Sequence, residues 1–251
     1  MQRYEKKLIL ILFLIPFFSC TTSWKVVNIE SKLLLVEESK LHAGGEKMRM
    51  FIDPYKQELD SQLSFRIGEF KEDMKLSAPE SLLSNYCADA LLIYTQEHYP
   101  FEVDFSILNF GGLRKPLLKG IVTIRDIYEL MPFDNEAVVI ELSGKDVYSL
   151  LHKIANKGGE PISGVRMTIP IEDLSDIQIN GKIIDLTKNY NIVTSDYLSD
   201  GNDEFYVMTN RTRISYLKIK MRDILINYSI DKTNKGETIG SSLDGRIYVK
   251  K

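Results

Sequence analysis

The feature that most restricts the fold is the irregular order of helical and extended patterns between residues 64 and 249. Apolar residues recur at helical spacing or follow a capping residue in four segments, which predicts helices at residues 80–98, 124–131, 144–157 and 219–228. Apolar runs and alternating patterns predict strands at residues 64–70, 101–108, 137–142, 162–169, 177–184, 190–194 and 246–249. Because the strands and helices do not alternate strictly, an α+β fold with a mixed sheet is favoured over a doubly wound fold.

The region before residue 64 has weaker patterns. Apolar residues predict a strand at 25–37, and the Gly44-Gly45 pair predicts a loop at 41–47. A helix is predicted within residues 48–63, after Asp53, with Pro54 in its first turn, where proline is well tolerated. Further along, the residues between Ser195 and Glu204 are expected to form a loop.

Composition excludes several classes of protein. The chain is 44% hydrophobic and 27% charged, which is typical of a globular protein rather than a disordered one. Its 32 basic and 35 acidic residues give a formal charge of −3, so a nucleic acid polymer is not an expected partner. Two cysteines cannot form a disulfide scaffold or a cysteine-rich zinc module.

The first nineteen residues have the pattern of a secretory signal. Arg3, Lys6 and Lys7 precede an apolar run over residues 8–18, which is too short to span a bilayer. Ser19 followed by Cys20 resembles a bacterial lipoprotein cleavage site, so lipidation of Cys20 is expected. A plain signal peptide and an uncleaved anchor are the alternatives. The expected organisation is a signal at 1–19, a tether at 20–24, and one domain at 25–251, held by lipid at the bacterial cell envelope, on the periplasmic side or the cell surface.

Few residues are suited to metal or nucleophilic chemistry. The three histidines, His42, His98 and His152, are far apart in sequence and lie in no metal-ligand motif. Cys87 lies in an apolar helical segment without a basic neighbour, which favours a small core residue over a nucleophile. No nucleophile elbow, phosphate-binding loop or dinucleotide motif is present. No catalytic residue, metal site or cofactor is therefore expected in this chain.

Three segments are candidates for a binding site. Residues 109–114 place Asn109, Gly111, Gly112 and Arg114 after a predicted strand, and arginine can pair with carboxylate or phosphate oxygens. Residues 131–135 carry Phe133 at a helix end, and residues 196–205 carry Tyr197 and Asp203 among turn-forming residues. Aspartate can accept hydrogen bonds from sugar hydroxyls, and an aromatic ring offers a stacking face. The alternative is ordinary turn sequence, with both aromatics half-buried.

Taken in order, several motifs resemble the C-terminal domain of the 5′-nucleotidase family, which includes UDP-sugar hydrolases and cyclic phosphodiesterases. The resemblance extends from about residue 25 to residue 249. It rests on Pro79-Glu80-Ser81 with Asn85 and Asp89-Ala90, Asn109-Phe110-Gly111-Gly112-Leu113-Arg114, Gly120-Ile121-Val122-Thr123, Pro132-Phe133-Asp134-Asn135, Leu142-Ser143-Gly144, Ser163-Gly164 and Gly245-Arg246-Ile247.

The resemblance implies a four-layered α/β/β/α domain that binds a nucleoside between two aromatic rings, which by position are Phe133 and Tyr197. It assigns the substrate-holding arginine to Arg114 with help from Asn109, and the ribose-binding aspartate to Asp203. Three features depart from the family. Ser77 replaces an arginine, Gly201-Asn202-Asp203-Glu204 replaces Gly-Gly-Asp-Gly, and the metal-binding catalytic domain is absent from this sequence.

Three hypotheses follow from the resemblance. In the first, the chain binds a nucleotide or nucleoside and acts in nucleotide catabolism with a separately encoded metallophosphatase domain, which holds the divalent metals. In the second, it is a lipid-anchored nucleoside-binding protein without a catalytic role. In the third, it is a degenerate domain retained for protein interaction.

Overall fold

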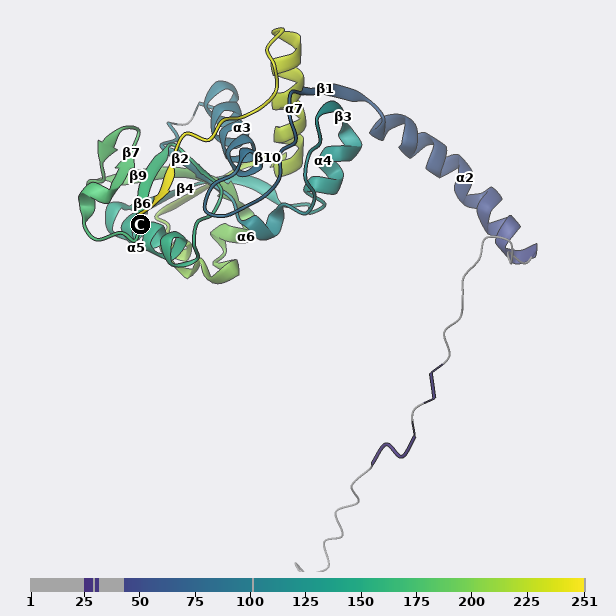
Figure 1. The fold of residues 1–251 in the computed structure, drawn as a ribbon, viewed down its shortest axis with the longest axis horizontal. Helices are drawn as coiled ribbons and strands as arrows, with labels where there is room; N and C mark the ends of the chain where they lie inside the picture. The colour runs from purple at the N-terminus through teal and green to yellow at the C-terminus, as the bar shows by residue number, and fades with distance from the viewer. Residues whose placement is uncertain (1–24, 29, 32–42, 101, 251) are drawn as a thin grey trace, which may run out of the picture. The chain divides into compact units, whose positions relative to one another are not determined.

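A computed structural model of the chain describes residues 25–28, 30–31, 43–100 and 102–250 (Figure 1). The chain divides into two units, Met1–Ile52 and Asp53–Lys251. The predicted signal, Cys20 and the tether lie outside the described residues. None of the helices in the described part is both long and apolar enough to cross a bilayer.

A five-stranded mixed sheet forms the centre of the second unit. Its order is β10 (Arg213–Lys220), β4 (Glu136–Ser143), β9 (Asn189–Ser195), β2 (Phe105–Ile107) and β5 (Ile162–Ser163). Strand β2 pairs with β9 in parallel, and the other pairs are antiparallel. The α+β prediction with mixed sheets is therefore confirmed.

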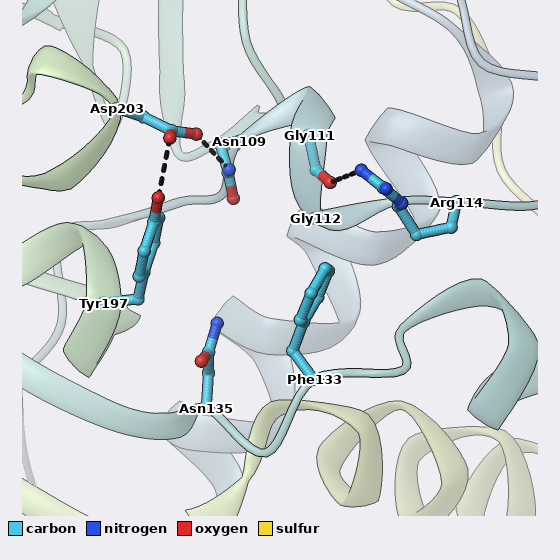
Figure 2. A pocket seen from close by; sticks show the side chains of 8 residues that line it. All are labelled: Asn109, Gly111, Gly112, Arg114, Phe133, Asn135, Tyr197 and Asp203. Carbon is cyan, nitrogen blue, oxygen red and sulfur yellow. Dashed lines mark hydrogen bonds between the residues drawn. The ribbon is translucent and has the colours of Figure 1, made fainter. Parts of the chain in front are cut away.

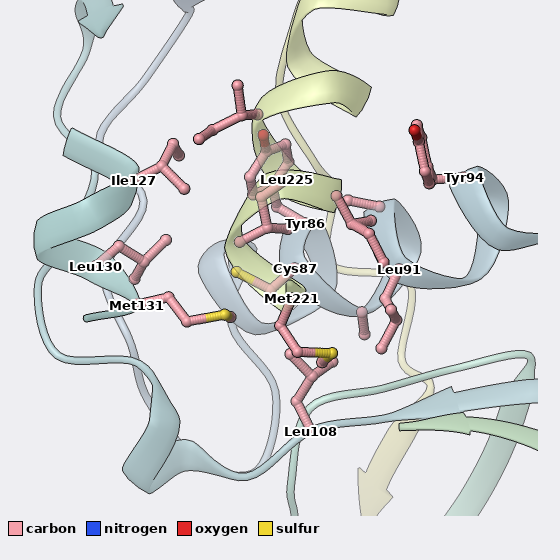
Figure 3. Packing of buried hydrophobic residues seen from close by; sticks show 14 of the residues in the cluster. Tyr86, Cys87, Leu91, Tyr94, Leu108, Ile127, Leu130, Met131, Met221 and Leu225 are labelled. Carbon is pink, nitrogen blue, oxygen red and sulfur yellow. The ribbon is translucent and has the colours of Figure 1, made fainter. Parts of the chain in front are cut away.

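Both faces of this sheet are buried, in two separate hydrophobic clusters. Along β4, Ala137 and Val139 belong to one cluster, whereas Val138, Ile140 and Leu142 belong to the other. This alternation follows from the two-residue period of a strand. The first cluster includes residues of three helices, α3 (Leu82–His98), α4 (Ile124–Leu130) and α7 (Met221–Asn234) (Figure 3). The second includes residues of α5 (Gly144–Asn156) and of a second sheet.

The second sheet has four strands in the order β11 (Ile247–Val249), β6 (Val165–Ile169), β7 (Ile177–Ile179) and β8 (Lys182–Ile183). The turn between β7 and β8 contains Asn180 and Gly181, both at positive φ (51° and 74°), as a tight hairpin requires. Apart from these sheets, β1 (Arg66–Phe70) and β3 (Gly120–Thr123) form an antiparallel pair.

Local sequence determines where the helices begin. Helix α3 starts after Ser81, whose hydroxyl accepts from the backbone N–H of Ser84, while Ser84 accepts from the backbone of Ser81. Thr123 and Asp126 form the same reciprocal cap at α4. Cys87 is completely buried in α3, where burial raises the pKa of its thiol, so the prediction of a core residue is confirmed.

Several of the motif residues form a hydrogen-bonded clamp, that is, the contacts of Asn85 and Asp89 in helix α3 with Ser242 and Arg246 in the C-terminal segment. The side-chain amide of Asn85 donates to Glu80 at 2.7 Å and to the Ser242 carbonyl at 2.8 Å. Arg246 donates to both carboxylate oxygens of Asp89 and also contacts Asp244. Burial opposes the charge of Arg246, but the bonds to the two aspartates outweigh it and raise the pKa of the guanidinium. These motif residues therefore hold the fold together away from the candidate binding segments.

The structure corrects the predictions for the N-terminal region. Helix α2 spans Ala43–Leu63, so the predicted loop at 41–47 is helical from residue 43, and Pro54 lies inside the helix rather than in its first turn. The Glu, Lys, Met and Arg residues before Pro54 favour helix strongly enough to extend it past the glycines. The predicted strand at 25–37 is absent from residues 25–28 and 30–31, which have no strand partner, and its remainder lies outside the described residues.

Two strands were missed and one loop contains helical turns. Strand β10 is an edge strand interrupted by an irregularity between Tyr216 and Lys220, with Lys218 at φ 56°, so its alternation is broken. Strand β3 has only four residues. The predicted loop at 195–204 contains α6 (Asp196–Ser199), which Ser195 caps, and a 3₁₀ turn over Asn202–Glu204.

We predict that Arg246→Ala lowers the free energy of unfolding by about 3 kcal/mol, because it leaves two carboxylates without their buried partner. Chemical denaturation measures this loss. Arg213→Ala is the control, since Arg213 forms an exposed ion pair with Glu141 and its removal is expected to cost less than about 1 kcal/mol. Equal effects of the two substitutions would contradict the clamp.

Candidate functional site

The start of β4 and the ends of β9 and β2 lie at the same end of the central sheet. Strand β4 pairs with β9 so that Ala137 lies opposite Ser195, and the residues before 137 and after 195 therefore leave the sheet at the same edge. Strand β2 runs parallel to β9, with Ser106 opposite Val193, so the chain after β2 also leaves there. This register brings residues 109–114, 131–135 and 196–204 together.

Phe133 and Tyr197 lie on opposite sides of the resulting cavity (Figure 2). Phe133 belongs to the segment that leads into β4, and Tyr197 lies in the first turn of α6. Their exposed fractions are 40% and 39%, so each ring has a substantial face outside the core. Both aromatics therefore line the same cavity, while the stacking of a base between them stays a prediction.

The turn after β2 is shaped by its two glycines and by a buried carboxylate. A β-carbon at Gly112 would lie 2.9 Å from the side-chain oxygen of Asn109, so glycine there allows Asn109 to fold back over the turn. Glu160, which is 3% exposed, accepts from the backbone N–H of Phe110 at 2.7 Å and pairs with Lys157 at 2.7 Å. A buried carboxylate, paired with a partly exposed lysine, therefore anchors the turn from behind.

Asp203 receives hydrogen bonds from two sides. The Tyr197 hydroxyl donates to Oδ1 at 2.9 Å, and the Asn109 side-chain amide donates to Oδ2 (Figure 2). The first of these bonds raises the pKa of Tyr197. The backbone of Asp203 is left-handed, with φ 53°, a conformation that aspartate tolerates better than most residues. Asp203 is thus held in place by residues of two different chain segments.

The two residues that replace glycine beside Asp203 both have partners. Asn202 donates from its side chain to the Tyr197 carbonyl at 2.8 Å. Glu204 is also left-handed, with φ 65°, and forms an ion pair with Lys153 of α5, which lowers the pKa of the Glu204 carboxyl. Glu204 does not line the cavity, and Lys153 neutralises its negative charge outside it.

Arg114 is the cation that lines the cavity. Its guanidinium donates to the Gly111 carbonyl at 3.1 Å and lies 5.7 Å from the centre of the Phe133 ring. Arg222 lies behind Phe133 instead, where it donates to the Phe133 carbonyl at 3.1 Å and pairs with Asp134. Arg222 therefore supports the segment that carries Phe133, while Arg114 lines the cavity.

All seven residues singled out in the sequence line one cavity of about 270 Å³. They are Asn109, Gly111, Gly112, Arg114, Phe133, Tyr197 and Asp203, and Asn135 completes the lining. Asn135 was not singled out, although it belongs to the Pro132–Asn135 motif. Its position relative to β4 is what could have indicated it: Asn135 lies two residues before Ala137, and Tyr197 lies two residues after Ser195, the partner of Ala137. Its side-chain amide points into the cavity between the two rings (Figure 2).

The remaining candidate groups lie elsewhere. Ser77, at the position of the family arginine, donates to the Glu80 carbonyl and does not line the cavity. His98 is the last residue of α3 and His152 lies within α5, whereas His42 is outside the described residues. Within the described part of the chain, no three His, Cys, Asp or Glu side chains are grouped as a metal site would require. The cavity itself offers two aromatic faces for a flat ring, with amide, guanidinium and carboxylate groups around them that can donate or accept hydrogen bonds.

The protein is an α+β domain with a cavity at the ends of its central strands, and sequence comparison gives its family. A family model described as "5'-nucleotidase, C-terminal domain" matches residues 66–210, more than half of the chain. The chain belongs to this family of 5′-nucleotidase C-terminal domains. It is 23% identical over 192 residues to a 5′-nucleotidase of Vibrio vulnificus, covering 68% of this chain and 34% of that protein.

Solved structures have the same fold. The 5′-nucleotidase precursor from Thermus thermophilus aligns with a TM-score of 0.64 at 22% identity, over 82% of this chain and 43% of that one. The NAD nucleotidase of Haemophilus influenzae aligns with a TM-score of 0.62 at 18% identity, over 82% and 42% of the two chains. The chain thus spans about a third of the curated relative's length and less than half of each of these structures.

Proposed function

We propose that this chain binds a nucleotide or nucleoside, with the base stacked between Phe133 and Tyr197. The observation that carries the proposal is the convergence of seven residues from three segments on one cavity with an aromatic ring on each side. Base stacking on an aromatic side chain contributes roughly 1–3 kcal/mol per contact. Asp203 and Asn109 would contact the sugar, and Arg114 would meet the phosphate side of the ligand.

Hydrolysis of the phosphate ester is assigned to a different domain. We propose that a metallophosphatase domain on a separate chain supplies the divalent metals and the activated water, and that this chain presents the nucleotide to it in nucleotide catabolism. Two observations support this division of roles. The family match is to the C-terminal domain, and the cavity is lined by aromatic rings, side-chain amides, one arginine and one aspartate.

We predict that Phe133→Ala raises the dissociation constant for adenosine or AMP about tenfold or more, because one stacking face is lost. Tyr197→Ala is expected to have an effect of the same direction. Isothermal titration calorimetry with adenosine, AMP and a UDP-sugar measures both. Tyr216→Ala is the matched control, since Tyr216 is exposed on β10 and does not line the cavity. Absence of binding by the unaltered chain to every one of these ligands would favour the protein-interaction hypothesis.

We predict that the purified chain with AMP and a divalent metal releases no phosphate above the uncatalysed rate. Addition of a cognate metallophosphatase chain is expected to give hydrolysis that falls when Phe133 is replaced by alanine. Phosphate release measured with and without that second chain tests the division of roles. Robust metal-dependent hydrolysis by this chain alone would contradict it, and binding without any gain from the second chain would favour a purely binding role.

We propose further that lipid on Cys20 anchors the chain at the cell envelope, on the basis of the Ser19-Cys20 pair after an apolar run. Two lipid-linked acyl groups are enough for stable membrane attachment. The expected result is that Cys20→Ser moves the protein from the membrane fraction to the soluble envelope fraction. Equal fractionation of the variant and the unaltered protein would contradict lipid attachment at this residue.

A further inference from the structure

The hydroxyl of Tyr197 makes a contact that base stacking does not require. It donates to Asp203 Oδ1 at 2.9 Å, while the aromatic ring of the same residue forms one side of the cavity. Phenylalanine at this position would provide the same stacking face without the hydrogen bond. The oxygen of Tyr197 therefore has a separate effect, and that effect acts on Asp203.

The orientation of the Asp203 carboxylate depends on its two donors. Tyr197 binds one oxygen and Asn109 binds the other, and these donors come from the turns after β9 and β2. The Asp203 backbone lies in a short 3₁₀ turn with left-handed φ, next to Gly201, whose φ of 87° marks a tight reversal. Because the turn is exposed, the two hydrogen bonds are the contacts that fix which way the carboxylate faces.

A carboxylate held in this way has acceptor capacity left on both oxygens. Each ionised carboxylate oxygen has two lone-pair sites, and one on each is used by Tyr197 or Asn109. Asp203 is the carboxylate among the residues that line the cavity, since Glu204 pairs with Lys153 outside it. Two hydroxyls on adjacent ring carbons of a ligand, on the same face, can each donate to one oxygen. A ligand that lacks them leaves this acceptor pair partly unsatisfied.

We infer that the Tyr197 hydroxyl is a positioning group that fixes the Asp203 carboxylate and so makes the site selective for ligands with a vicinal pair of hydroxyls. This inference rests on the proposed function. One residue then links two parts of recognition, because its ring stacks on the base while its hydroxyl orients the acceptor for the sugar. The hydrogen bond to Asp203 raises the pKa of Tyr197, which favours the protonated phenol that donates this bond.

The experiment measures selectivity rather than affinity alone. Dissociation constants for adenosine and 2′,3′-dideoxyadenosine are determined by calorimetry for the full chain, for Tyr197→Phe and for Tyr216→Phe, which removes an exposed hydroxyl outside the cavity. The unaltered chain and Tyr216→Phe are expected to prefer adenosine about tenfold or more. Tyr197→Phe is expected to bind dideoxyadenosine within about twofold of the unaltered chain but to prefer adenosine less than about threefold.

The possible failures are distinguishable. If Tyr197→Phe keeps the full preference for adenosine, or loses affinity for both ligands equally, the positioning role of the hydroxyl is wrong while nucleoside binding stands. If the unaltered chain binds both ligands with equal affinity, vicinal-diol selectivity is wrong while nucleoside binding still stands. If it binds neither ligand, the proposed function fails and this inference fails with it.

Discussion

The pairing of β4 with β9 is the constraint on which the candidate site depends. Seven consecutive residue pairs, from Ala137 opposite Ser195 to Ser143 opposite Asn189, fix the register of these strands. Both faces of the pair are buried in hydrophobic clusters, so a shift by one residue would turn apolar side chains such as Val138 and Val139 to the wrong faces. The same register brings the residues just before Ala137 and just after Ser195 to the same end of the sheet, so core packing helps to set how the segments that carry Phe133 and Tyr197 approach each other.

The walls of the cavity are supported by charges that lie behind them. Glu160 and Lys157 hold the turn after β2, and Arg222 holds the segment that carries Phe133. Lys153 neutralises Glu204. Since these charges are satisfied locally, the cavity itself is lined by one cation, Arg114, and one carboxylate, Asp203. With no excess of positive charge on the chain as a whole, capture of an anionic ligand would depend on Arg114 rather than on a long-range field.

Much of the second unit could be predicted from the sequence because its signals are local. Apolar spacing and capping residues located α3, α4 and α5. The ordered motifs and the turn-forming segment 196–205 together contain the seven residues that were singled out and that line the cavity. The missed features depend on tertiary contacts. Strand β10 forms only by pairing with β4, and its broken alternation gives little signal. Asn135 belongs to a motif in the sequence, but nothing in the sequence indicated that its side chain would line the cavity. The partner of Glu204 is Lys153 of α5, which no sequence spacing relates to Glu204.

The central claim is that a base binds between Phe133 and Tyr197. The most direct measurement is an amide NMR titration of the chain with adenosine, followed by the contacts of the bound purine protons. Stacking of the base between the two rings predicts that the largest shifts fall on Gly111, Gly112, Asn135 and the residues around Asp203. It also predicts contacts from the purine protons to both the Phe133 and the Tyr197 rings. Shifts confined to another surface, or a bound purine that contacts neither ring, would contradict it.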